Sequence, residues 1–185
     1  MFKIAIRPLA ITAALLAGSV AAYAANPMVG GGEMLETKNI VENAVNSKDH
    51  TTLVAAVQAA GLVETLSGPG PFTVFAPTNA AFAKLPAGTV DTLLKPENKA
   101  QLTKVLTCHV VAADVMAEAL VKMIADDGGE HDVTTVGGCV LKAKAADGKV
   151  TLTDENGGVS TVTIADVKQS NGVIHVVDAV ILPKM

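Results

Sequence analysis

The 185-residue chain is poor in aromatic side chains, with no tryptophan, one tyrosine and four phenylalanines. Its only arginine, Arg7, and its only tyrosine, Tyr23, both lie within the first 24 residues. Proteins that bind nucleic acids need clustered cations and commonly use stacking aromatics, so the composition argues against a nucleic-acid partner. A carbohydrate-binding platform of Trp and Tyr side chains is excluded as well, because the chain has no Trp and has no Tyr after residue 24.

Long hydrophobic runs are also missing after the first 24 residues, although the mean hydropathy is +0.42. Residues 1–24 have the pattern of a secretory signal peptide, with Lys3 and Arg7 followed by the apolar run 9–20. Ala22 and Ala24 then supply the small residues that a signal peptidase requires. The apolar run is shorter than the ~20 residues of a spanning helix, so we expect cleavage and export.

A cysteine for lipid attachment is absent from this leader. Residues 16–19 resemble a bacterial lipoprotein signal, but Ser19 stands where the acylated cysteine would be and cannot form the thioether. The mature chain would keep all 18 acids and 12 of the 14 cations, a net charge of −6, which disfavours charge-driven attachment to anionic membranes. We therefore expect a secreted protein, periplasmic or extracellular, without a stable membrane anchor.

Cysteine is scarce as well, since only Cys108 and Cys139 are present, 31 positions apart. In an oxidising compartment an even count favours a disulfide between them, and two buried free thiols are the alternative. Neither cysteine lies in a C-x-x-C motif, which argues against a redox enzyme.

Helical patterns precede strand patterns along the chain, apart from one early buried strand at residues 72–75. Asp114 is expected to cap a helix over residues 115–124, and from Asp132 onward the apolar period changes from about 3.6 to 2. This order predicts an α+β fold rather than alternating α/β units.

The boundaries and turns of that fold also follow from local signals. Residues 25–36 are predicted to be a flexible tether, and residues 37–185 a single domain without internal repeats. Asp147-Gly148 and Asn156-Gly157 predict tight hairpins, and a final short strand is expected at residues 180–182.

No group of residues with the spacing of a catalytic or metal site is found. None of the mature serines lies in G-x-S-x-G, and His109 and His175 stand beside apolar strand residues, as hydrogen-bonded core histidines commonly do. The acidic run at residues 126–132 has one histidine and lacks the order of a calcium loop, so we interpret it as a solvated turn. We expect no enzyme activity, no metal and no cofactor.

Two segments resemble the signatures of one known family. Residues 72–82 (FTVFAPTNAAF) are similar to the first signature of fasciclin domains, and residues 172–183 (GVIHVVDAVILP) resemble the second. The resemblance covers residues 37–183 and implies a single fasciclin-like domain, a β-wedge or sandwich of short strands flanked by helices. Cys108 replaces the tyrosine of the family's Tyr-His pair, so only His109 of that pair is retained.

The resemblance also implies a function, that of an exported, non-catalytic adhesion or interaction module. Such a module would contact a cell surface, the matrix or a host through protein–protein binding. A periplasmic carrier of a small hydrophobic ligand is the alternative. The partner and the oligomeric state stay open. The two signatures and the histidine motif also mark residues that we expect to have an interaction or structural role. They are Phe72, Phe75, Pro77, Thr78, Asn79, Phe82, His109, His175 and Asp178.

Overall fold

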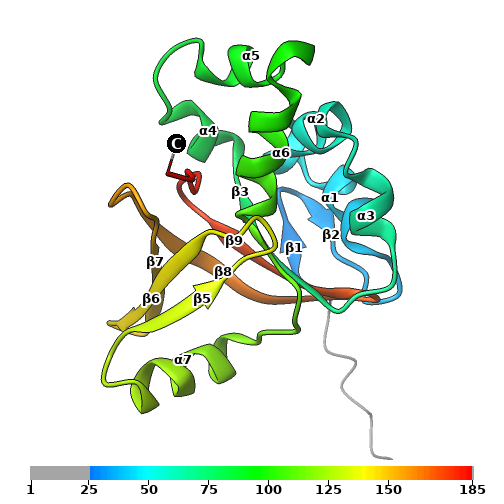
Figure 1. The fold of residues 1–185 in the computed structure, drawn as a ribbon. Helices are drawn as coiled ribbons and strands as arrows, with labels where there is room; N and C mark the ends of the chain where they lie inside the picture. The colour runs from blue at the N-terminus through cyan, green and yellow to red at the C-terminus, as the bar shows by residue number, and fades with distance from the viewer. Residues whose placement is uncertain (1–25, 185) are drawn as a thin grey trace, which may run out of the picture.

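The computed structural model describes residues 26–184, in which short helices surround one curved sheet (Figure 1). The predicted signal peptide lies outside the described residues. The α+β class and the helices flanking short strands are confirmed. In chain order the elements, with η for 3-10 helices, are β1 (Met28–Val29), β2 (Gly32–Glu33), α1 (Ile40–Asn46), η1 (Lys48–His50), α2 (Thr51–Ala60), α3 (Val63–Ser67), β3 (Phe72–Pro77), α4 (Asn79–Ala83), α5 (Thr89–Leu93), η2 (Pro96–Asn98), α6 (Lys99–Thr107), β4 (Val110–Val111), α7 (Ala117–Asp126), β5 (His131–Thr134), β6 (Val140–Ala146), β7 (Lys149–Thr153), β8 (Val159–Gln169) and β9 (Gly172–Val177).

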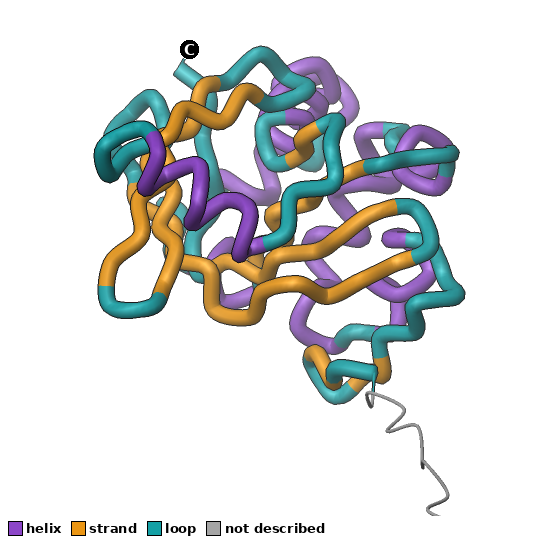
Figure 2. Tube along the Cα trace, turned by 90° about the horizontal axis from the view of Figure 1, so that it is seen from below, coloured by secondary structure: helices purple, strands orange, loops and turns teal. Residues whose placement is uncertain are grey.

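The main sheet has seven strands in the order β4-β3-β9-β8-β7-β6-β5. Only β3 and β9 pair in parallel, with Phe72 opposite Gly172 and Pro77 opposite Val177. The long strand β8 pairs with both β7 and β9, and two register shifts bend it between these partners. Beyond β5, the Val136 N–H donates to the Val110 carbonyl at 2.7 Å. This contact brings the two ends of the sheet together, so the sheet wraps nearly into a barrel (Figure 2).

Two hydrophobic clusters fill the two sides of this sheet. The first lies under helices α1 to α6 and contains Phe82, and the second lies between α7 and strands β5 to β8 and contains Phe75. Phe72, at the start of β3, is half-buried against the first cluster. Figure 1 shows α7 on one side of the sheet and the other helices on the opposite side. The three phenylalanines of the described residues are therefore divided between the two cores.

Among the described helices, α1 and α4 begin at a residue whose side chain caps them. Asn39 forms a reciprocal capping box with Glu42 at the start of α1. The predicted cap of α7 is wrong, because the helix begins at Ala117 and not at residue 115. The Ala117 N–H donates to Asp166 Oδ1 at 2.7 Å, so a carboxylate from β8 replaces Asp114 as the acceptor.

The predicted flexible tether before residue 37 is contradicted by the structure. Strands β1 and β2 form a small hairpin, and Val29 and Met34 are 4% and 2% exposed in the first core. The side-chain amide of the buried Asn43 pairs with the backbone N–H and carbonyl of Leu35 at 3.0 and 2.8 Å. Strands of two residues have no periodicity, so their anchoring could not be read from the pattern.

The predicted last strand at residues 180–182 is also absent, and we call residues 180–184 the C-terminal segment. Side chains from elsewhere hold its backbone instead of a neighbouring strand. The N–H groups of Ile181, Leu182 and Lys184 donate to His109 Nε2, Asp154 Oδ2 and Glu155 Oε2 at 2.9, 3.0 and 3.1 Å. The segment thus lies against the α6–β4 junction and the turn between β7 and β8.

Candidate functional site

The two signature segments lie side by side at the centre of the sheet. The first signature forms β3 and the second forms β9, and their parallel pairing places Phe75 opposite His175. The two rings stack with their centroids 5.7 Å apart. The structure therefore brings these signature residues together, although about a hundred positions separate them in the sequence.

His175 connects β9 to the segment that leads into α7. Its Nε2 lies 2.7 Å from the Val115 carbonyl, and its Nδ1 accepts from the Asp166 N–H at 3.2 Å. These partners require a neutral ring protonated at Nε2. Burial lowers the pKa of His175, which favours the same neutral form.

His109 makes the corresponding connection at the end of α6. Its Nδ1 lies 2.8 Å from the Val105 carbonyl, and its Nε2 accepts from the Ile181 N–H. The ring is 2% exposed, and burial lowers its pKa to about 4. Both ring nitrogens of both histidines therefore bond to backbone groups, which leaves neither ring a free nitrogen for general acid–base chemistry.

The burial of His109 predicts that the free energy of unfolding decreases in acid. The pKa of His109 is about 4 in the folded protein against 6.5 for an ordinary histidine, so the unfolded chain binds more protons between these values. We expect the stabilisation that comes from keeping the His109 ring neutral to be fully present above pH 6.5. It should fall by about 2–3 kcal/mol towards pH 4. Urea unfolding across this pH range measures it.

The matched variant for this prediction is His109→Gln, whose amide can both donate and accept but does not titrate. We expect a flatter dependence of unfolding free energy on pH, with a residual slope from His50 and His175, whose pKa values burial also lowers. An unchanged slope in the variant would show that His109 does not carry the effect.

The remaining residues of the first signature fasten β3 and α4 to the helices. Pro77 ends β3, and Thr78 Oγ1 accepts from the Ala81 N–H at 3.2 Å as the N-cap of α4. Asn79 Oδ1 accepts from the Thr52 N–H at 3.0 Å, and its Nδ2 donates to the Lys48 carbonyl at 2.9 Å. Asn79 therefore supplies the N-terminal cap that α2 lacks within its own sequence.

Asn79→Ala is expected to lower the free energy of unfolding by about 1–2 kcal/mol, because it leaves an N-terminal N–H of α2 and a loop carbonyl without partners. Asn98→Ala is the control, since the Asn98 amide makes one exposed bond, to the Thr92 carbonyl. Denaturant unfolding of both variants measures the difference. Equal losses would contradict the cross-element cap.

Asp178 follows β9 and holds the neighbouring strand. Its Oδ1 accepts from the Thr161 N–H at 2.7 Å, and its other oxygen lies 3.5 Å from Lys84 Nζ. The ion pair is exposed, and such pairs contribute little to stability. The contribution of Asp178 is therefore its bond to the backbone of β8.

The disulfide predicted between Cys108 and Cys139 is present. It links the end of α6 to the residue before β6, and both cysteines are buried, at 0% and 2% exposure. Near it, the Gly137 N–H donates to the Thr107 carbonyl at 3.0 Å. The bridge thus fastens the place where the two ends of the curved sheet meet.

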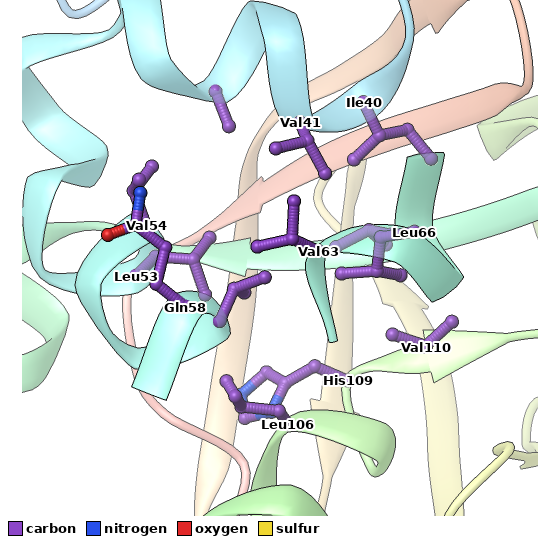
Figure 3. A pocket seen from close by; sticks show the side chains of 13 residues that line it. Ile40, Val41, Leu53, Val54, Gln58, Val63, Leu66, Leu106, His109 and Val110 are labelled. Atoms are coloured by element: carbon purple, nitrogen blue, oxygen red, sulfur yellow. The ribbon is translucent and has the colours of Figure 1, made fainter. Parts of the chain in front are cut away.

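Apolar cavities in the described structure are small. Figure 3 shows one between α1, α2, α3 and the end of α6, with His109 at its floor and a volume of about 30 Å³. That volume is far below the size of a ligand pocket. A larger hollow of about 560 Å³ beside Pro71 and Asn171 is open and has both polar and apolar walls.

Charged side chains of the acidic run pair with their neighbours. Asp127 lies 2.5 Å from His131, and Glu130 lies 2.6 and 2.9 Å from Lys142 and Lys144. Hydrogen bonds from these two lysines lower the pKa of the Glu130 carboxyl. Within residues 26–184, no group of three or more His, Cys, Asp or Glu is arranged to hold a metal ion.

The arrangement of β3, β9 and the helices around them matches a known domain. A family model described as Fasciclin domain matches residues 48–183, which include both signature strands. The chain belongs to the fasciclin domain family. The resemblance drawn from the two signatures is thereby confirmed.

Several proteins are similar to this fasciclin domain. Protein sll1483 of Synechocystis is 53% identical over 79% of this chain and 74% of its own length. Immunogenic protein MPB70 of Mycobacterium bovis is 34% identical over 97% and 88% of the two chains. Transforming growth factor-beta-induced protein ig-h3 of Sus scrofa is 36% identical over 71% of this chain, but over only 17% of its own length.

A solved structure shares the fold of this fasciclin domain. It is a FAS1 domain pair from the insect cell adhesion molecule Fasciclin I, with a TM-score of 0.68 and 18% identity over 78% of this chain. This chain covers 51% of that protein, about half its length, and at this identity the likeness shows the fold alone. Within the described part of this fasciclin domain, no helix has the length and apolarity needed to cross a bilayer.

Sequence reasoning missed two aspartates that act beside His109 and His175. Asp166 and Asp154 hold the same segments as His175 and His109, respectively. Asp166 has a φ of 57°, a backbone conformation that favours Gly, Asn and Asp, but nothing in the sequence marks it. The only available signal for Asp154 was its place beside the Asn156-Gly157 turn.

Proposed function

We propose that this fasciclin domain is an exported, non-catalytic interaction module that contacts a cell surface, the matrix or a host by protein–protein binding. Membership of the fasciclin domain family supports an interaction role, and the solved structure from an insect cell adhesion molecule shares the fold. The observation that carries the proposal is a sheet face without a covering helix, on strands β5 to β8. Its exposed or half-buried residues include Asp132, Thr134, Val140, Lys142, Lys144, Thr151, Thr153, Val159, Thr161 and Thr163.

The opposite face of the same strands explains why this one is open. Leu141, Ala143 and Leu152 alternate with the exposed positions, and they are fully buried in the cluster that α7 covers. Val140 and Val159 on the open face are 37% and 55% exposed. Exposed valines among threonines and lysines suit a protein partner that buries a mixed apolar and polar surface.

The alternatives have less support in the described residues. A carrier needs an enclosed apolar pocket of ligand size, and the apolar cavities have volumes of about 30 Å³ or less. An enzyme needs free titratable groups that converge, whereas His109 and His175 are engaged at both nitrogens. The interaction role is therefore the proposal that fits these contacts best.

The test is a binding assay with the labelled mature protein and intact cells of the species that produces it. We expect saturable binding, reduced at least about tenfold when both Val140 and Val159 are replaced by Lys, since central apolar contacts dominate interfaces. Val45→Lys is the matched control, because Val45 is 58% exposed on α1. Non-saturable binding, or equal loss in the control, would contradict the proposed surface.

A further inference from the structure

The turn between β7 and β8 holds the C-terminal segment through three consecutive side chains. Asp154 and Glu155 accept from the N–H groups of Leu182 and Lys184, as described above. Asn156 Nδ2 donates to the carbonyls of Leu182 and Pro183 at 3.0 and 3.1 Å. Asn156 is the member of this trio that donates, and both of its bonds depend on its side chain remaining an amide.

We propose that Asn156 is a site of spontaneous deamidation, and that this modification releases the C-terminal segment. The next residue is Gly157, and an added Cβ there would meet no atom within 4 Å. Gly157 therefore has no side chain to hinder its approach to Asn156. Its N–H donates to the Asp154 carbonyl at 3.0 Å, and this one bond of the turn must open before the nitrogen can react. The exposure of Asn156 gives water access to the same place.

The reaction needs only water. The backbone nitrogen of Gly157 attacks Cγ of Asn156 and loses its proton, ammonia leaves, and a five-membered succinimide forms. Water then opens the ring at either carbonyl, which gives aspartate or isoaspartate. The net change is the gain of one water and the loss of one ammonia, with no oxidation or reduction.

The same dipeptide occurs at Asn171-Gly172, where the structure opposes the reaction. Asn171 Oδ1 accepts from the Ile40 N–H at 3.0 Å, and its Nδ2 donates to the carbonyls of Leu66 and Gly68 at 2.8 and 2.9 Å. Freeing Asn171 requires opening the start of α1, the end of α3 and the β3–β9 pair. Freeing Asn156 requires only that one turn and the C-terminal segment separate, a local opening of lower free energy.

Deamidation would replace the two hydrogen bonds that Asn156 donates with repulsion between oxygen atoms. A carboxylate at position 156 cannot donate a hydrogen bond, yet it would face the carbonyl oxygens of Leu182 and Pro183. It would also add a third negative charge beside Asp154 and Glu155, and an isoaspartate would lengthen the backbone of the turn. The C-terminal segment would lose two hydrogen bonds and be repelled by the new carboxylate. Because the modification is covalent, the segment could not recover these bonds by returning to the turn.

Peptide mapping by mass spectrometry of the full mature chain, aged in mildly alkaline buffer, tests the site. In denaturant, Asn156 and Asn171 should deamidate at similar rates, because both precede glycine. In the folded protein, Asn156 should react at least about tenfold faster than Asn171, since its opening is local. Equal rates in the folded protein, or protection of Asn156 as complete as that of Asn171, would overturn the assignment.

Hydrogen exchange of the Leu182 and Lys184 amides tests the release. We expect exchange at least about fivefold faster in Asn156→Asp than in the unmodified protein, because local opening becomes easier. Asn46→Asp is the control, since it adds the same charge on exposed residue 46 at the end of α1. Asn156→Gln, which cannot form the five-membered ring, should show no deamidation at this position. Unchanged exchange in Asn156→Asp would refute release even if deamidation occurs.

Discussion

Replacing Gly172 with alanine is expected to prevent stable folding, with a loss of more than about 4 kcal/mol in the free energy of unfolding. A Cβ at this position would lie 1.9 Å from the Phe72 carbonyl oxygen and 2.8 Å from the Phe72 backbone carbon and nitrogen. Phe72 is the direct partner of Gly172 in the parallel pair of β3 and β9. Neither backbone can move away without breaking the central ladder of the sheet. Soluble yield, circular dichroism and denaturant unfolding measure the effect.

Gly148→Ala is the matched control for this prediction. Gly148 has a φ of +74° in the hairpin between β6 and β7, and an added Cβ would meet no atom within 4 Å. We expect a loss of only about 1 kcal/mol, the usual penalty for a side chain in the left-handed region. If Gly148→Ala destabilised the protein as much as Gly172→Ala, backbone conformation and not the contact with Phe72 would explain the loss.

Removing the disulfide is the second change with a large expected effect. In the double variant Cys108→Ala/Cys139→Ala, we expect the free energy of unfolding to fall by about 3–4 kcal/mol. The reason is that the unfolded chain is no longer restricted by a loop of 31 positions. The bridge also fastens the place where the ends of the sheet meet, so the loss should begin there. Urea unfolding, with hydrogen exchange of the Val136 and Gly137 amides, measures both effects.

The reduced wild-type protein provides the control for the double variant. Both lack the covalent link, but the reduced protein keeps its sulfur atoms, so it separates the link from side-chain packing. We expect the two to unfold at similar denaturant concentrations. A double variant as stable as the oxidised protein would show that the noncovalent contacts alone hold this junction.

Local features of the fold could be predicted from the sequence because their causes are local. The hairpin at Asp147-Gly148 and the turn at Asn156-Gly157 each depend on a few adjacent residues. The hairpin of β1 and β2 was missed, because its stability comes from Val29 and Met34 packing into a distant core. Long-range packing of this kind leaves no periodic signal in two-residue strands.

For the candidate site, the sequence likewise predicted the residues that lie in motifs but not their distant partners. His109 and His175 could be selected because they lie in motifs, and their burial followed from apolar neighbours. Their partners Asp154 and Asp166 were missed, since each acts on a segment far away in the sequence. The C-terminal segment was expected to be a strand because it is apolar, but side chains and not a neighbouring strand satisfy its backbone. Such contacts depend on the completed tertiary structure.

The parallel pairing of β3 and β9 has a consequence for the order in which the chain can fold. Strand β3 is made early, but its partner is the last strand of the domain, about a hundred positions later. A growing chain cannot complete the centre of its sheet until nearly all residues are available. Pairing between such distant segments makes folding slow. An incomplete chain therefore lacks the centre of its sheet, a state that suits the export proposed for this protein.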